Sequence, residues 1–130
     1  MQWVYLINGI YGAALALLIW SWKLSEAPIR LFVAEDYSLG THGQVWKDWN
    51  AVGCAFVAAI NACAWSMDFN AVALRAVALC TAGIYGIWAL QNARLLVSAN
   101  TPYVKPLMWI HALLCGTCAA LAGCAALSFS

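Results

Sequence analysis

The chain has 130 residues, of which 65% are hydrophobic and only 8% are charged. Soluble domains average roughly 45–50% apolar and ~25% charged residues, so a water-soluble fold of this length has no way to bury so much apolar surface. The formal net charge is +1 with six Lys and Arg, which leaves no basic stripe for a phosphate backbone and argues against nucleic-acid binding. The composition therefore predicts an integral membrane protein.

Four long apolar runs predict an all-α membrane protein with four transmembrane helices in a bundle. Each run approaches or exceeds the ~20 residues that a helix needs to cross about 30 Å of hydrocarbon. The predicted helices cover about 3–22, 49–67, 70–90 and 106–129, within one domain that spans 1–130. The first run lacks a basic segment before it and a small-residue cleavage site after it, so we expect a retained helix rather than a signal peptide.

The first loop, residues 23–48, is the only sizeable segment predicted outside the membrane. Pro28 suits the opening turn of a helix, and the apolar residues after it share one side, so we expect a short interfacial helix in this loop. Glycines and small polar residues predict a turn over 37–43. Between the second and third helices only a few residues remain, which predicts a tight turn and antiparallel neighbours.

The Lys and Arg residues concentrate on one predicted side of the membrane. All but Arg75 lie in or beside the first and third loops, at Lys23, Arg30, Lys47, Arg94 and Lys105. Cytoplasmic loops carry an excess of Lys and Arg, so this bias predicts that the two loops face a cytoplasm-like side, opposite both termini. Bacterial inner, mitochondrial inner and thylakoid membranes fit the sequence equally.

Glycines at helical spacing predict close packing between helices. Small residues let helix backbones approach where lipid provides no hydrophobic drive for association. The predicted packing positions are Gly9, Gly12, Gly83, Gly86, Gly116 and Gly123. Gly-Ile-Tyr-Gly occurs at both 9–12 and 83–86, and the Cys54 to Cys63 spacing recurs at Cys115 and Cys124. Either a helical hairpin has been duplicated about an axis along the membrane normal, or an alanine-rich chain matches itself by chance.

His111 is the candidate cofactor ligand, because it lies within the last predicted helix with Cys115 and Cys118 on the same face. Ligands on one face of one helix do not surround an ion, and no further cluster in the apolar runs completes the coordination. We therefore predict no metal-ion site. An intramembrane imidazole either hydrogen-bonds a neighbouring helix or ligates haem iron or the magnesium of a chlorophyll, so a bound pigment or lipid stays open.

Cys115 and Cys118 form a CxxC and are the candidate redox pair. Four-helix membrane oxidoreductases similar to vitamin K epoxide reductase carry such a pair, together with a loop cysteine pair that relays electrons. The first loop of this chain contains no cysteine, and the mid-bilayer depth predicted for Cys115 disfavours a thiolate. All six cysteines lie in apolar runs, so small apolar packing residues are the expected role.

Arg75 is the one charged residue well within a predicted helix. A charged side chain inside the membrane is energetically costly and therefore usually indicates a functional role. Its place near the helix start favours an interface anchor that reaches the headgroups, with Asp68 as a partner across the turn. No acidic residue lies deep in any predicted helix, which counts against proton relays, sodium-coupled carriers and carbocation-stabilising isomerases.

The sequence favours a non-catalytic multi-pass subunit that packs against other helices of a larger membrane complex, respiratory or photosynthetic. Little extramembrane mass, many close-packing residues and the absence of a catalytic set support this hypothesis. The alternative is a small membrane enzyme or binding protein for an apolar ligand, and a less favoured one is a thiol oxidoreductase that uses the CxxC. The residues expected near an apolar ligand are Tyr11, Asn61, Tyr85 and His111.

Overall fold

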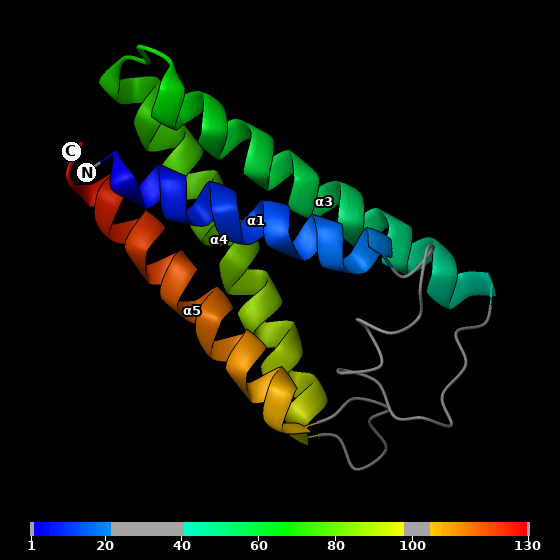
Figure 1. Ribbon diagram of the computed structural model, residues 1–130. Coiled ribbons are helices and arrows are strands. Elements are labelled where there is room, and N and C mark those ends of the chain that lie inside the picture. Colours follow the sequence, from blue (N-terminus) through cyan, green and yellow to red (C-terminus); the bar gives the residue numbers. More distant parts are fainter. Residues whose placement is uncertain (1, 22–40, 98–104, 130) are drawn as a thin grey trace.

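The computed structural model describes residues 2–21, 41–97 and 105–129, and within these ranges the chain is all-helical (Figure 1). The described helices are α1 (Trp3–Ser21), α3 (Thr41–Ser66), α4 (Ala71–Val97) and α5 (Lys105–Leu127). The predicted all-α class is therefore confirmed. The interfacial helix predicted in the first loop, together with Lys23 and Arg30, lies outside the described residues.

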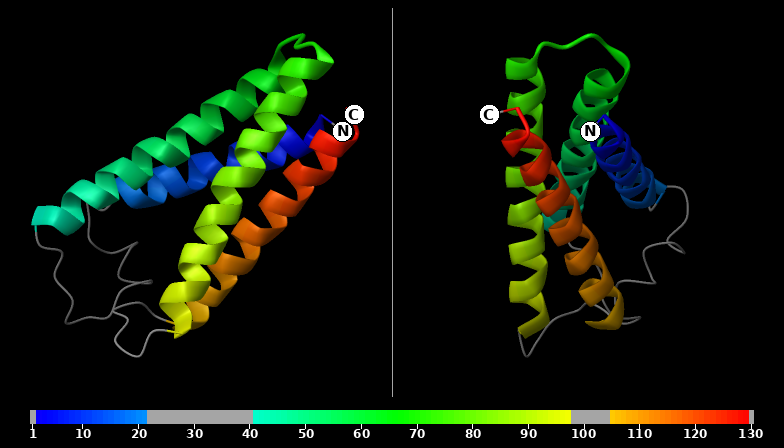
Figure 2. Two further views of the ribbon diagram at one scale, coloured as in Figure 1. Left: turned by 180° about the vertical axis from the view of Figure 1, so that it is seen from behind. Right: turned by 90° about the vertical axis from the view of Figure 1, so that its left-hand side faces the viewer.

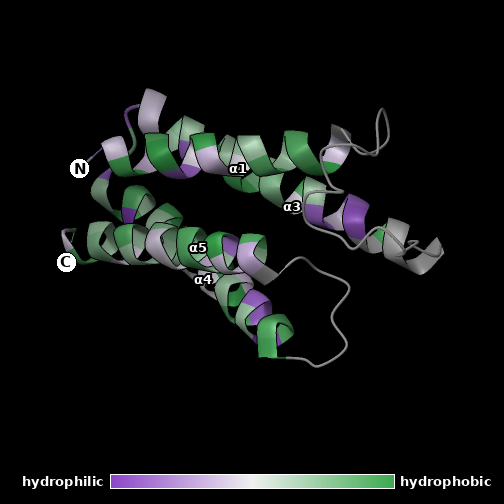
Figure 3. Cartoon of the chain, turned by 60° about the horizontal axis from the view of Figure 1, so that its bottom comes forward, coloured by the Kyte–Doolittle hydropathy of each residue, from purple (hydrophilic) through white to green (hydrophobic). Residues whose placement is uncertain are grey.

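Three helices in the described part of the chain are long and apolar enough to cross a membrane, which makes this a multi-pass membrane protein in contact with lipid. The spans are Trp3–Trp20, Ala71–Val97 and Pro106–Leu127. Although α3 is long enough at 26 residues, its polar first ten residues and Asn61 lower its hydropathy. Figure 3 shows hydrophilic residues toward the N-terminal end of α3, whereas α1 and α5 are hydrophobic along most of their length.

Two helices extend further into polar sequence than predicted. Instead of beginning near residue 49, α3 begins at Thr41, so the turn prediction for 37–43 is wrong at 41–43. At its end, α4 continues past Leu90 through Gln91 and Arg94 to Val97. Hydropathy marks the part of a helix that lies in lipid, whereas the backbone hydrogen bonds of a helix continue through polar residues into the interface.

A tight turn at residues 67–70 joins α3 to α4. Asn70 caps α4, since its Oδ1 accepts a hydrogen bond from the backbone N–H of Ala73 at 2.8 Å. Near the end of α3, Ser66 Oγ donates to the backbone carbonyl of Ala62 at 2.8 Å. The short connection predicted between these helices is thus present, but the helices diverge from it and pack together over a short stretch only, so the prediction that they are packed neighbours is wrong beyond the turn (Figure 2).

The four described helices form two closely packed pairs, α1 with α3 and α4 with α5. Between the pairs, α1 meets α5 and α3 meets α4 over much shorter stretches. Figures 1 and 2 show that the pairs lie closest near the chain termini and diverge toward the opposite end. Exchanging α1 with α4 and α3 with α5 leaves this contact pattern unchanged, as a duplicated helical hairpin requires.

The buried core follows this division. Near the termini, one cluster brings together residues of all four described helices, among them Tyr5 of α1 and Ala78 of α4. A middle cluster centres on Tyr85 and Cys115. Toward the diverging end, a third cluster joins α4 and α5 alone, with Leu96 packed near Met108. The apolar contacts between the two pairs therefore lie in the first two clusters.

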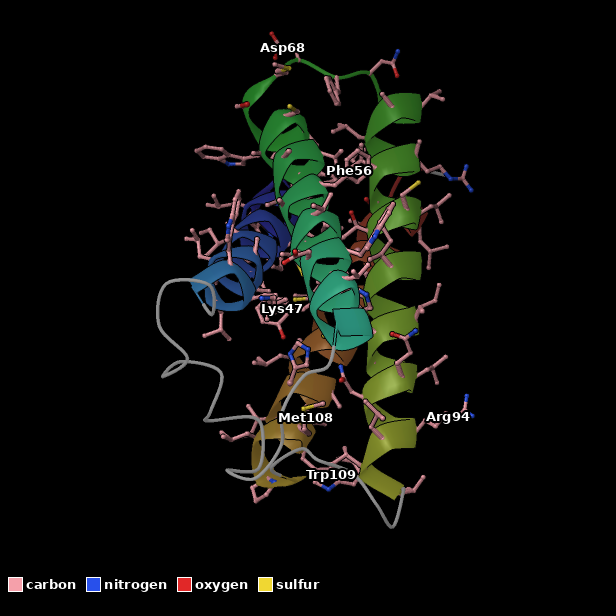
Figure 4. The ribbon with its side chains drawn as sticks, turned by 90° about the vertical axis from the view of Figure 1, so that its right-hand side faces the viewer. Lys47, Phe56, Asp68, Arg94, Met108 and Trp109 are labelled. Carbon is pink, nitrogen blue, oxygen red and sulfur yellow. The ribbon has the colours of Figure 1, made fainter. Side chains whose placement is uncertain are left out.

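Charged side chains lie at opposite ends of the molecule. Lys47 and Arg94 lie toward the diverging end, and Asp68 lies at the α3–α4 turn (Figure 4). Arg94 points away from the helices, which suits a headgroup or aqueous environment. The grouping of Lys47 with Arg94 agrees with the predicted charge bias, and the side of the membrane that this end faces stays a prediction.

Candidate functional site

Tyr11 of α1 and His111 of α5 meet between the two helix pairs. The Oη of Tyr11 lies 2.8 Å from Nδ1 of His111, and the ring centroids are 6.2 Å apart. Both side chains are partly buried, so this hydrogen bond lies at the edge of the core. In lipid such a bond joins helices directly, because no water competes for either group.

Cys115 completes this cluster, one helical turn after His111. Its Sγ lies 3.7 Å from Tyr11 Oη and 3.8 Å from His111 Nε2, and the residue is fully buried. Its sequence partner Cys118 is buried one turn further along, and both are free thiols. We call Tyr11, His111 and Cys115 the Tyr–His–Cys centre.

Tyr85 of α4 connects this centre to the rest of the interior. Its hydroxyl donates to the backbone carbonyl of Asn8 at 2.8 Å, and its ring lies 5.6 Å from that of Tyr11. Trp88 contacts the same ring edge-on at 5.5 Å. Tyr85 is 0% exposed, so it holds α4 against α1 with both its ring and its hydroxyl.

A second polar group lies between α1, α3 and α4, and we call Asn8, Asn61 and Thr81 the amide layer. All three residues are 0% exposed. Asn61 Nδ2 donates to Thr81 Oγ1 at 2.9 Å and to the backbone carbonyl of Val57 at 2.9 Å. Neither Asn8 nor Thr81 was predicted from the sequence, although a lone polar residue in an apolar run is a signal for an interior position.

Three atoms of the amide layer have no hydrogen-bond partner among the described protein groups. They are Nδ2 and Oδ1 of Asn8 and Oδ1 of Asn61. Buried polar atoms are nearly always paired in native proteins, and in lipid the penalty for an unpaired one is larger than at a wet surface. This layer is the least satisfied part of the described interior.

The six predicted packing glycines fall into two groups. A Cβ at Gly12 would lie 3.0 Å from the backbone oxygen of Cys54 and 3.1 Å from the backbone nitrogen of Ala58, both in α3. Gly9 lies against the same helix, with 3.5 Å to the Cβ of Asn61. The other group has no atom of the described chain within 4 Å of the Cβ position, and it comprises Gly83, Gly86, Gly116 and Gly123.

Arg75 lies exposed on the first turns of α4. Asp68, at the preceding turn, is exposed as well, and these two described residues do not form an ion pair with each other. An anchoring role for Arg75 at headgroup depth therefore has to rest on lipid contacts rather than on Asp68.

Within the described residues, no group of three or more His, Cys, Asp or Glu side chains is placed to hold a metal ion. A haem or chlorophyll ligated by His111 would have to use Nε2, because Nδ1 is taken up by Tyr11. The centre offers a hydroxyl, an imidazole and a thiol, which can hydrogen-bond the polar group of an apolar ligand. Comparison with protein-family models, curated proteins and solved structures finds no match for this chain.

Proposed function

We propose that the protein is a non-catalytic multi-pass subunit that packs against transmembrane helices of other proteins through the outer faces of α4 and α5. The observation that carries this proposal is the group of open glycines, Gly83, Gly86, Gly116 and Gly123. A glycine inside a helix is less stable than alanine by about 0.5–1 kcal/mol, and contact with lipid offers no compensation. Close packing of a partner helix against these glycines would compensate for that loss of helix stability.

The proposal includes α3 as a fourth membrane-spanning helix. Its buried Asn61 hydrogen-bonds to Thr81 inside the protein, so this polar group does not face lipid. The short turn at 67–70 also keeps the end of α3 beside the start of α4. Four crossings return the chain to the side where it began, in agreement with the two termini, which lie toward one end of the molecule in Figures 1 and 2.

The partner complex expected for such a subunit is energy-transducing, either respiratory or photosynthetic. A small chain of 14.0 kDa with few charged residues suits an accessory position between larger subunits. The membrane would then be a bacterial inner, mitochondrial inner or thylakoid membrane.

Native separation of the solubilised membrane tests this function. The membrane is extracted in a mild detergent and run on a native gel, with an absorption spectrum and mass spectrometry of every co-migrating chain. We expect the protein in a large assembly, and we expect Gly86→Leu and Gly116→Leu to release it. Leu90→Phe, which adds bulk at an exposed position of the same helix, is the matched control. A lone chain or a simple homo-oligomer would overturn the proposal.

The second candidate is a small enzyme or binding protein for an apolar ligand at the Tyr–His–Cys centre. The observation that favours it is the convergence of Tyr11, His111 and Cys115 from helices 100 or more residues apart. On this hypothesis, Tyr11→Phe and His111→Gln lose a co-purifying apolar molecule, which lipid extraction and mass spectrometry detect. Loss of a partner chain with retention of that molecule would favour the second candidate over the first.

The thiol oxidoreductase hypothesis places its chemistry on Cys115 and Cys118. Both are free thiols and both are buried, which leaves little access for a second disulfide or thiol substrate. A double-serine variant that keeps its native assembly and function would remove this hypothesis.

A further inference from the structure

The amide layer concentrates unpaired hydrogen-bonding capacity in the membrane interior. Asn8 lacks protein partners for both atoms of its amide, and Asn61 lacks one for its oxygen. The two residues belong to adjacent helices at one level, since the Cβ position of Gly9 is 3.5 Å from the Cβ of Asn61. One donor and two acceptors are thus buried without protein partners on the adjacent helices α1 and α3.

Both polar atoms of the Asn8 amide lack a protein partner in the orientation that the structure shows. A side chain of another protein does not reach them either, because Asn8 and Asn61 are 0% exposed. A small molecule enclosed by the helices is the kind of partner that reaches these atoms.

The mixture of donor and acceptors indicates which small molecule fits. A hard cation such as Ca²⁺ or Mg²⁺ binds oxygen ligands, so it would leave the Asn8 Nδ2 group unpaired and close to a positive charge. Water donates two hydrogen bonds and accepts two, and buried waters typically bind through about three such contacts. The donor and two acceptors found here match that requirement.

We propose that the amide layer is an internal water-binding site between α1, α3 and α4. A bound water accepts a hydrogen bond from Asn8 Nδ2 and donates one to Asn61 Oδ1. Its second hydrogen, or a second water, serves Asn8 Oδ1. Because Asn61 Nδ2 donates to Thr81 Oγ1, the water links three helices through one hydrogen-bonded layer, and this inference stands independently of the proposed function.

Nuclear Overhauser effects to water test the site directly on the unaltered protein. The full chain is labelled with nitrogen-15 and placed in nanodiscs of deuterated lipid, and the side-chain amide signals of Asn8 are assigned by their loss in Asn8→Leu. We expect a cross-peak between the Asn8 amide protons and water. The exposed Asn70, which caps α4, is the positive control. Asn8 amide protons that contact only protein protons would overturn the proposal.

Thermal unfolding of Asn8→Leu gives a second, independent test. If water is bound, the substitution removes its contacts, strands Asn61 Oδ1 and lowers the unfolding midpoint. If the layer is dry, the same substitution deletes two unpaired polar atoms and raises the midpoint, which would overturn the proposal. Thr117→Val is the control, because the Thr117 hydroxyl bonds within its own helix at an exposed position, at 2.9 Å from the Leu113 carbonyl. Should Asn8→Leu not fold, the Asn8 amide signals are assigned through bonds from the backbone signals of the unaltered protein, and the water cross-peak decides.

Discussion

The two copies of Gly-Ile-Tyr-Gly in α1 and α4 serve different contacts. In α1, Gly9 and Gly12 lie at the closest approach to α3, whereas Gly83 and Gly86 of α4 meet no atom of the described chain within 4 Å. Both tyrosines nevertheless point inward, Tyr11 to the side chain of His111 and Tyr85 to the backbone of Asn8. In both copies, therefore, the tyrosine points into the interior. The flanking glycines contact a neighbouring helix in α1 but not in α4.

This difference shows which pair of helices uses its glycines for packing within the chain. The α1–α3 pair already uses its small residues for close contact within the chain. The α4–α5 pair packs through other positions, such as Leu96 with Met108, and a Cβ at any of its four glycines would meet nothing within 4 Å. We therefore expect substitutions at equivalent positions of α1 and α4 to have unequal effects on the isolated chain.

The largest difference is expected between Gly12→Leu and Gly86→Leu. A side chain at Gly12 meets backbone atoms of α3 at 3.0 Å and 3.1 Å, so the helices must separate, with a loss of about 3 kcal/mol in the free energy of unfolding. Gly86→Leu should leave the isolated chain nearly unchanged. Thermal unfolding followed by circular dichroism in detergent measures both. Equal destabilisation by the two variants would contradict the comparison.

A smaller difference in stability is expected between the variants that remove the hydroxyl of Tyr85 and of Tyr11. Tyr85→Phe leaves a fully buried backbone carbonyl with one hydrogen bond fewer, and we expect a loss of about 1 kcal/mol. Tyr11→Phe should be milder, because Tyr11 and His111 are only partly buried and Cys115 Sγ stays close to the imidazole. Denaturant titration of both variants gives the order, and a larger loss for Tyr11→Phe would reverse it.

Much of this architecture follows from the sequence, and the rest depends on tertiary packing. Apolar length locates α1, α4 and α5 because a fixed hydrocarbon thickness sets it. The i, i+4 spacing also places His111 and Cys115 on one face. That Tyr11 joins them depends on the packing of α1 against α5, which no local pattern encodes. Nor does glycine spacing say which glycines are in contact with another helix of the chain.

A smaller effect is expected in the amide layer at Thr81→Val. This change keeps the shape of the side chain and removes the acceptor of Asn61 Nδ2, which retains its bond to the Val57 carbonyl. Hydrogen bonds between membrane helices average about 0.6 kcal/mol, and we expect a loss of that order in unfolding experiments. Thr117→Val, at an exposed position of α5, is the matched control. An equal loss in the control would place the effect outside the amide layer.

The smallest expected effect is a gain in stability rather than a loss. Gly86→Ala removes backbone freedom from the unfolded chain and improves helix propensity, so the isolated chain should gain about 0.5 kcal/mol. Gly9→Ala is the comparison in the other copy, where the Cβ would be in ordinary contact with α3 at 3.5 Å. Thermal midpoints of the two variants, and of native assemblies that contain them, measure this effect. A loss of stability for Gly86→Ala in the isolated chain would show that this face is already packed.

The turn at residues 67–70 also bears on how the chain enters the bilayer during synthesis. A fully extended residue spans at most ~3.6 Å, so a connection this short reaches less than half of the about 30 Å hydrocarbon thickness. The end of α3 must then stay at the bilayer surface where α4 starts. Because α3 is the more polar of the two, we expect the translocon to insert α3 and α4 into the bilayer together, with the strongly apolar α4 driving the insertion of both.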